Sequence, residues 1–151
     1  MAKTIYDYWF VQFDFTDEKG NPYKSSNGEM IYTDDHILPK GWKICKIRDI
    51  ISSICTGLNP RDNFSLGSGN IKYITVKNLT TKGTLDFTGC DTIDESARTI
   101  IHNRSDIQIG DILFASIAPL GRCYLIQEEP TNWDINESVF SIRANVDVVT
   151  P

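Results

Sequence analysis

The sequence is poor in the residues that build metal sites and nucleophilic active sites. It has two histidines and four cysteines among its 151 residues, and no two cysteines form a C-x-x-C pair. Because a structural zinc site usually draws on two closely spaced ligand pairs, we expect no metal, and we expect the cysteines to be buried free thiols. The HExxH, GxSxG and GxxxxGK[ST] motifs are also missing, so no catalytic residues are predicted.

Long apolar segments are missing as well. No run of about 18 apolar residues occurs, and the first residues lack the apolar core of a signal peptide. We therefore expect a cytoplasmic protein without a membrane partner. The length suits one domain with its own core, and the 40% hydrophobic and 23% charged residues are typical of a globular chain.

The net charge of −5 by itself argues against nucleic-acid binding, but the charges are unevenly distributed. Residues 40–85 carry eight basic and two acidic side chains, whereas residues 1–39 and 86–151 are acidic. Such a basic segment can form a surface that faces phosphates. The alternative is that these side chains only solvate strand and helix faces, and the charge pattern taken alone favours this alternative.

Several segments carry clear secondary-structure signals. Residues 71–76 are β-branched and aromatic, which predicts a strand. Residues 94–99 predict a short helix capped by Thr92 or Asp94. The aromatic residues 5–15 are interpreted as a helix end that runs into an extended arm. Further strands are expected at 30–32, 82–87, 109–115, 121–127 and 138–143.

Isoleucines recur at helical spacing in the segment 44–54. The spacing predicts an amphipathic helix that ends at Gly57, where a glycine can supply a left-handed cap. Trp42, Ile47 and Ile50 are expected to belong to the core. The isoleucines that form the pattern are Ile44, Ile47, Ile50, Ile51 and Ile54.

Together these elements predict an α+β fold, in which a strongly curved, mostly antiparallel sheet is accompanied by a few short helices. Residues 16–41 contain turn signals in quick succession, so they are expected to form a linker or an extended arm. The expected division of the chain is an arm at 1–39 and a domain at 40–151.

Five segments share motifs with one protein family. Residues 38–50 are similar to a P-x-GW-x-x-x-x-L-x-D pattern, with Ile47 in place of the leucine, and residues 57–60 follow with G-x-x-P. Residues 71–79 form an expected strand that ends in a polar pair, and 109–122 and 136–143 complete the order. In their order and spacing these segments resemble the target recognition domain of a type I restriction-modification specificity subunit.

The upstream residues 6–28 resemble the conserved segment that precedes the second recognition domain of such a subunit. The resemblance therefore implies one half of a specificity subunit, which recognises a sequence in double-stranded DNA and catalyses no reaction. It implies the modification (methyltransferase) subunit as a partner and, through it, the restriction or motor subunit. No cofactor is expected on this chain, since in that family S-adenosylmethionine belongs to the modification subunit and ATP to the motor subunit.

DNA contacts are expected from polar and basic groups, because Arg, Lys, Asn and Gln read bases and any cation can contact a phosphate. Arg122, which follows the Pro-Leu-Gly turn, is expected to read a base, and Lys77, at a strand end, to contact a phosphate. Ser116 and Asn136 have an alternative role in hydrogen bonding that turn, and Arg143 is expected to be structural or solvated. The predicted DNA-binding residues are Arg61, Lys72, Lys77, Asn78, Ser116, Arg122 and Asn136.

Two other functions remain open. A protein-interaction module would dock on the modification subunit through the aromatic segment 5–15 and read no bases. A small hydrolase would need an acid cluster or a Cys–His pair in a pocket, and the spacing of Cys90 and His102 gives no positive indication of one. A basic concave surface around Arg61 and Lys77 would favour DNA binding, and an exposed apolar face would favour the protein-interaction module.

Overall fold

The computed structural model describes residues 2–33 and 35–149 of the chain. It divides into two compact units, Met1–Cys45 and Lys46–Pro151, which we call the N-terminal unit and the C-terminal unit and describe separately. The expected division lay between residues 39 and 40. Residues 150 and 151, at the end of the expected recognition domain, lie outside the described residues.

Aromatic packing holds the N-terminal unit together. Phe15 stacks on Tyr23 and on Trp42, with ring centroids 4.9 and 5.1 Å apart. The expected extended arm is therefore wrong, because these rings give the segment a small packed cluster of its own, whereas the expected strand at 30–32 is confirmed. The elements of this unit are α1 (Ala2–Tyr6), the π-helical turn η1 (Asp7–Val11) and the antiparallel strand pair β1 (Met30–Tyr32) and β2 (Ile37–Pro39).

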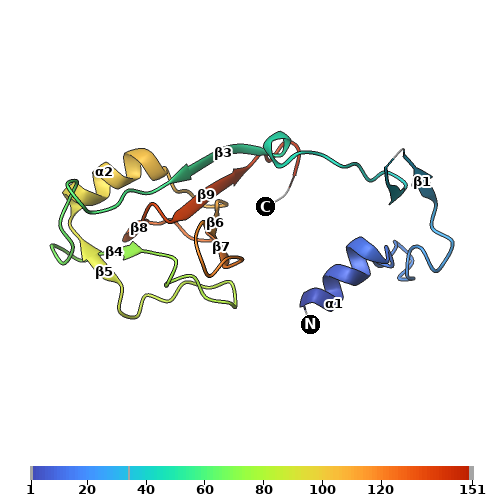
Figure 1. Ribbon diagram of the computed structural model, residues 1–151, viewed down its shortest axis with the longest axis horizontal. Coiled ribbons are helices and arrows are strands. Elements are labelled where there is room, and N and C mark those ends of the chain that lie inside the picture. The colour runs from blue at the N-terminus through green and yellow to red at the C-terminus, as the bar shows by residue number, and fades with distance from the viewer. Residues whose placement is uncertain (1, 34, 150–151) are drawn as a thin grey trace. The chain divides into compact units, whose positions relative to one another are not determined.

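The C-terminal unit contains two sheets and one longer helix (Figure 1). One sheet is antiparallel with the strand order β3-β9-β6-β7, and the other has the order β5-β4-β8, in which β4 and β8 run parallel. The protein is thus mixed α and β with mostly antiparallel sheets and few short helices, as expected, but its strands form separate sheets and not one. The elements are η2 (Ile47–Asp49), β3 (Ile51–Thr56), β4 (Ile71–Ile74), β5 (Asp91–Ile93), α2 (Glu95–Ser105), β6 (Ile112–Ala115), β7 (Cys123–Leu125), β8 (Trp133–Ile135) and β9 (Val139–Ala144).

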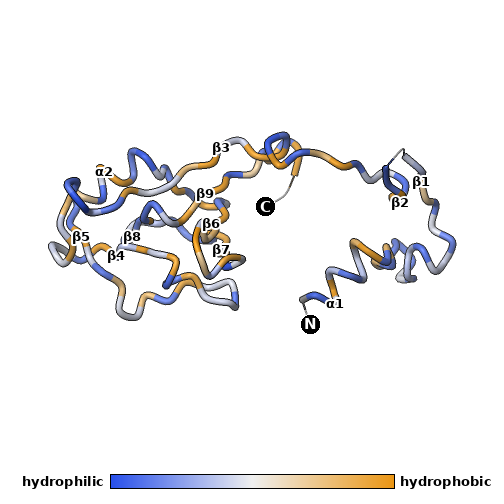
Figure 2. The backbone as a smooth tube through the Cα atoms, viewed as in Figure 1, coloured by the Kyte–Doolittle hydropathy of each residue, from blue (hydrophilic) through white to orange (hydrophobic). Residues whose placement is uncertain are grey.

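The core of the C-terminal unit has two parts. In the first part, Ile74 of β4 and Ile135 of β8 pack with Leu113 of β6 and Val139 of β9, so that this part joins the two sheets. β6, whose four residues are all apolar, is orange in Figure 2. The second part lies between α2 and the three-stranded sheet, and consists of Ile71, Tyr73, Ile93, Ala97 and Ile101.

Helix α2 begins where the sequence predicts. The Asp94 side chain accepts a hydrogen bond from Ala97 N at 2.9 Å, which confirms the expected cap. The helix continues from this expected start to Ser105, because burial of Ala97 and Ile101 against the sheet stabilises further turns. It ends at Asp106, which adopts the left-handed conformation.

The expected helix over 44–54 is wrong. This segment forms the 3₁₀ turn η2 and then strand β3, which pairs with β9. Its β-branched residues suit a strand, and β9, which lies far away in the sequence, supplies the hydrogen bonds that make the strand stable. None of the three residues expected in the core is fully buried: Ile47 is 70% exposed, and Trp42 and Ile50 are half-buried.

Gly57 follows β3 for a different reason from the one expected. It does not adopt the left-handed conformation, and a Cβ atom added there would lie 1.6 Å from the carbonyl oxygen of Ile135. The glycine therefore allows the end of β3 to pass close to β8. The expected strand at 82–87 is also wrong, since it contributes only an isolated bridge between Leu79 and Leu85.

A buried carboxylate fixes strand β9. Asp111 is fully buried and accepts hydrogen bonds from Arg143 Nε and Nη2 at 2.8 and 2.9 Å, from Ser141 Oγ and from Gln108 N. Arg143 Nη1 also donates to Asp106 at 3.0 Å, and this bond holds the pKa of Asp106 below its ordinary value. Arg143 is therefore structural, as expected, and it ties β9 to the segment between α2 and β6.

A second buried carboxylate, Asp134, lies in β8. Its Oδ1 accepts hydrogen bonds from Ser105 Oγ and Ile135 N, and its Oδ2 lies 3.2 Å from His102 Nδ1. Burial raises the pKa of Asp134, although the hydrogen bond from Ser105 opposes this effect. The folded state therefore favours the protonated carboxyl, so this group stabilises the fold at low pH and loses that contribution as the pH rises through the raised pKa.

The position of Ile47 gives a first prediction. Because the side chain is mostly exposed, Ile47→Ala should change the free energy of unfolding by no more than about 0.5 kcal/mol. The matched change Ile101→Ala, at a fully buried site, should cost about 2–5 kcal/mol. Urea unfolding of the two variants measures both values, and a large loss in the Ile47 variant would contradict the assignment of η2 and β3.

The two buried carboxylates should respond differently to the same substitution. Asp111→Asn places an NH₂ group against hydrogen-bond donors and leaves Arg143 without its full charge partner, so it should cost about 3–5 kcal/mol. Asp134→Asn can keep the hydrogen bonds at Oδ1 and donate to a neutral His102, so it should cost far less.

The pH dependence gives a further test of the second carboxylate. Relative to the wild-type chain, the Asp134→Asn variant should become more stable as the pH rises from below the ordinary pKa of an aspartate through the raised pKa of Asp134, because the variant has no carboxyl group that must ionise in a buried site. Urea unfolding over a pH series that starts below the ordinary pKa measures the difference, and an opposite trend would show that Asp134 is stabilised in its charged form.

Candidate nucleic-acid interface

A polar pocket of about 380 Å³ brings together segments that are far apart in the sequence. It is formed where β4 ends, where β5 begins, and where the turn between β8 and β9 lies. Three of the predicted DNA-binding residues, Lys77, Asn78 and Asn136, line it. The other lining residues are Tyr73, Thr75, Val76, Thr88, Gly89, Cys90, Asp91, Ile117 and Ser138.

Asn78 holds the wall of this pocket together. Its Oδ1 accepts hydrogen bonds from Thr75 N and Oγ1, and its Nδ2 donates to Asp86 O at 2.9 Å and to Cys90 Sγ at 3.0 Å. The residue is 7% exposed, so both ends of the amide are used inside the protein. The side chain forms the turn that exposes Lys77, and it has little capacity left to read a base.

Lys77 is the cation at the pocket. It is exposed, and it forms no ion pair within residues 2–33 and 35–149. Asp91 also lines the pocket, so the charge there is mixed. A phosphate at this site would therefore be bound through Lys77 Nζ, away from the carboxylate.

Asn136 offers one free hydrogen-bonding group. Its Oδ1 accepts from Ser138 N at 3.0 Å and from Ser138 Oγ at 2.6 Å, which fixes the orientation of the amide. Its Nδ2 has no hydrogen-bond partner in the described part of the chain. Ser116 contacts the same turn, since its N and Oγ donate to Ser138 O at 2.9 and 2.7 Å. The alternative role of Ser116 and Asn136 thus involves Ser138 and not the Pro-Leu-Gly turn.

Arg122 lies at the end of the loop that joins β6 to β7, directly before β7. Its Nη1 donates to Leu79 O at 3.1 Å, and Ala115 N donates to Arg122 O at 3.0 Å. Its Nε is buried and has no hydrogen-bond partner among the described residues. The guanidinium is therefore partly committed to the main chain, and its expected contact with a base stays a prediction.

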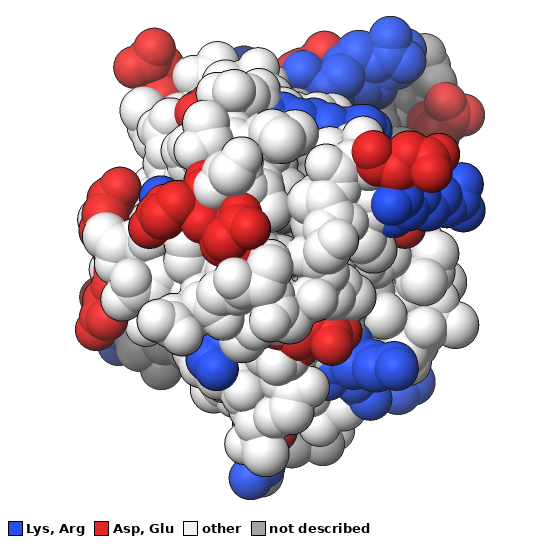
Figure 3. Space-filling model, turned by 90° about the vertical axis from the view of Figure 1, so that its left-hand side faces the viewer, with Lys and Arg blue, Asp and Glu red and all other residues white. Residues whose placement is uncertain are grey.

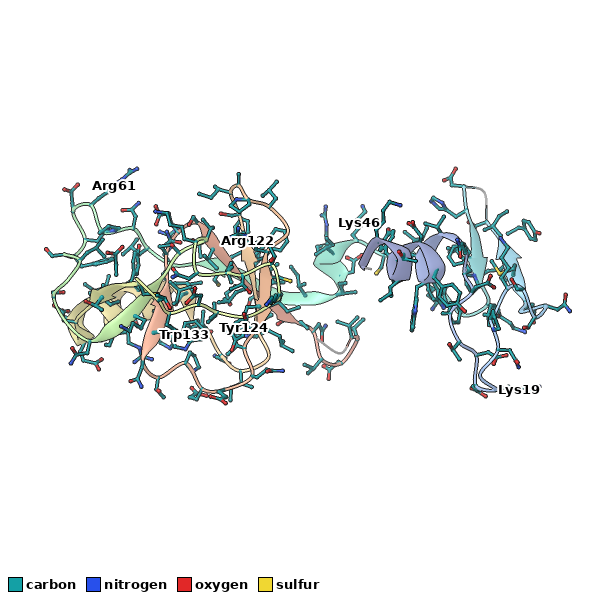
Figure 4. All side chains as sticks on the ribbon, turned by 90° about the horizontal axis from the view of Figure 1, so that it is seen from below. Lys19, Lys46, Arg61, Arg122, Tyr124 and Trp133 are labelled. Carbon is teal, nitrogen blue, oxygen red and sulfur yellow. The ribbon has the colours of Figure 1, made fainter. Side chains whose placement is uncertain are left out.

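The remaining two candidates lie elsewhere in the C-terminal unit. Arg61 is exposed on the loop between β3 and β4, and Figure 4 shows it well apart from Arg122. Lys72 is half-buried in β4, and its charge partly offsets the rise that burial causes in the pKa of Cys90. The structure thus joins Lys77, Asn78 and Asn136 in one pocket but leaves Arg61 outside it.

The basic segment 40–85 is divided between the two units. Lys40 and Lys43 belong to the N-terminal unit, where Lys40 Nζ lies 2.7 Å from a carboxylate oxygen of Glu29. Viewed from the side of α2 and β5, the described basic and acidic side chains are interspersed (Figure 3). On this face, the described side chains therefore form no broad positive surface.

The cysteines and histidines do not converge at the pocket. Cys90 Sγ accepts from Asn78, whereas His102 on α2 contacts Asp134. All four cysteines are free, but Cys45 and Cys123 are exposed and Cys55 and Cys90 are only partly buried, so the expectation of buried thiols is wrong. In the described residues, no group of three His, Cys, Asp or Glu side chains could hold a metal ion, and no helix could cross a membrane.

Sequence reasoning missed two exposed apolar residues in the loop between β6 and β7. Ile117, which lines the pocket, and Leu120, which does not, are 54% and 69% exposed. Large apolar side chains in a Pro-Gly turn were a signal that could have identified them. No local signal marks the wall at 88–91, which reaches the pocket only through the pairing of β4 and β5.

In comparisons with known proteins, neither a protein-family model nor a curated protein matches the sequence. A functional assignment therefore depends on the geometry of this pocket and on the motif segments.

The role of Asn78 gives a prediction for this site. Asn78→Ala removes the acceptor of Thr75 N and the amide donor to Asp86 O, both in partly buried hydrogen bonds, so it should destabilise the fold by about 1–3 kcal/mol. The control Asn103→Ala, at an exposed position of α2, should change stability by less than about 0.5 kcal/mol. Thermal and urea unfolding measure both, and equal stability of the two variants would show that the amide network is dispensable.

Proposed function

We propose that this chain recognises a sequence in double-stranded DNA, as a target recognition domain of a type I restriction-modification specificity subunit. One observation carries the proposal. Three of the segments that resemble this family, 71–79, 109–122 and 136–143, are far apart in the chain but each contributes a residue to the same polar pocket. Packing alone does not require that Lys77, Asn136 and the exposed side chain of Ile117 come together at one surface.

The chemistry of the pocket supports this function. A hollow cannot enter a groove of the duplex, but it can receive the convex sugar-phosphate backbone. Lys77 supplies the cation for a phosphate, and Asn136 Nδ2 supplies a free donor in a fixed orientation. The loop between β6 and β7 projects beside the pocket and can reach base edges.

The proposed protein catalyses no reaction itself. It would direct the modification subunit and, through it, the restriction or motor subunit to the target, and it would carry no cofactor of its own. These partners follow from the resemblance of the motif segments, and the geometry of the pocket is compatible with a binding role.

A second candidate function is docking on the modification subunit without base reading. The observation that favours it is the apolar surface of the N-terminal unit, where Tyr6, Trp9 and Phe10 are 59%, 44% and 50% exposed. Exposed aromatic groups that lie together often mark a protein-binding surface. The two functions are compatible, since they use different units of the chain.

Binding of the full chain to a mixed-sequence duplex library at low salt tests the proposal. Binding should be weak, and the affinity should fall steeply as salt increases, because phosphate neutralisation releases counterions. Lys77→Ala should weaken binding to all sequences alike and reduce the salt slope by about one unit. Fluorescence anisotropy over a salt series measures both effects.

The control is Lys82→Ala, which removes an exposed lysine of the same unit that does not line the pocket. This variant should keep the wild-type slope. Absence of duplex binding by the wild-type chain, or equal effects of the two lysine variants, would contradict the proposed site.

A further inference from the structure

The loop between β6 and β7 exposes two apolar side chains at its tip. Ile117 and Leu120 are 54% and 69% exposed. Single exposed apolar side chains are common on proteins, but here two large ones lie within one seven-residue loop, at 116–122. Exposure of these two apolar side chains to water is unfavourable, and a ligand that covers them would remove this cost.

The loop is held firmly at both ends. On one side, Ser116 N and Oγ donate to Ser138 O at 2.9 and 2.7 Å. On the other side, Arg122 Nη1 donates to Leu79 O, and Gly121 has a φ of +84°, which favours glycine. The tip is therefore preorganised, so that binding through it would cost little conformational entropy.

The surroundings of the tip indicate its ligand. Ile117 also lines the polar pocket, together with Lys77 and Asn136. An apolar pocket of another protein that covered this loop would remove the lysine and the free amide group from water without pairing them, which is costly. The major groove of a duplex provides both kinds of partner, because the thymine methyl group is apolar and phosphates lie beside the groove.

We infer that Ile117 and Leu120 recognise thymine in the major groove of DNA, through contact with its 5-methyl group. The inference rests on the proposed function and adds the base and the chemical group that this loop reads. Arg122 is then a positioning residue that anchors the loop to Leu79 O. The apolar tip distinguishes thymine from cytosine, which has no methyl group at this position.

Replacement of single thymines by uracil tests the inference, since this removes only the methyl group. A preferred duplex is first selected from a library with the full chain. Each thymine in that duplex is then replaced in turn, and the affinity is measured by anisotropy. For the wild-type chain, one or two replacements should weaken binding about fourfold each, the factor that corresponds to burial of one methyl or methylene group.

Two variants remove the proposed contacts. Leu120→Ala and Ile117→Ala should each bind more weakly than wild type and lose the uracil penalty at one position, because the methyl group no longer has a partner. Ile109→Ala is the matched control: Ile109 is 55% exposed in the same unit but lies outside the loop between β6 and β7. This control should keep both the affinity and the uracil penalty. Circular dichroism checks that each variant is folded.

The outcomes separate this inference from the proposed function. If the wild-type chain binds no duplex at low salt, both fail. If it binds but no uracil replacement matters, or if the penalty persists in both loop variants, the thymine contact is wrong while DNA binding stands. Unchanged duplex binding by Leu120→Ala, with loss of binding to the modification subunit, would assign the loop to a protein contact and overturn the inference.

Discussion

The hydrogen-bonded ion pair between Asp111 and Arg143 is the interaction on which the arrangement of the C-terminal unit depends. Asp111 is fully buried, and its charge is tolerated only because the guanidinium of Arg143 and two further donors satisfy it. Arg143 lies on β9, the central neighbour of both β3 and β6. The pair therefore sets the position of β9, and with it the turn at 136–138 that forms one side of the pocket.

Some residues of the pocket hold its walls together, whereas others have groups that a ligand can reach. Asn78 and Ser138 use their polar atoms on neighbouring segments, and Gly57 lets β3 approach β8 because it has no side chain. Lys77 Nζ and Asn136 Nδ2 are left free of partners among the described residues. The rigid groups thus hold a small number of free donors in place, which is what selective recognition of a charged, shaped ligand requires.

Local signals predicted part of the fold. The Asp94 cap and the β-branched residues at 71–76 gave correct elements, because a hydrogen bond to Ala97 and a strand propensity depend on near neighbours. The isoleucine pattern at 44–54 failed, because β-branched residues also suit a strand and pairing with β9, which lies far away in the sequence, decided between the two. The three-residue strands β5 and β8 are too short to show any periodicity.

Local sequence patterns were enough to predict a mixed α and β fold with polar and basic groups near strand ends. Which of these groups remain free depends on contacts between distant segments. Asn78 uses both ends of its amide on its neighbours, among them Asp86 and Cys90, and Arg122 gives one of its donors to the carbonyl of Leu79, across separations of 8 to 43 residues. A hydrogen-bonding group is available only if no neighbour in space satisfies it, and such neighbours are set by strand pairing and packing between distant segments.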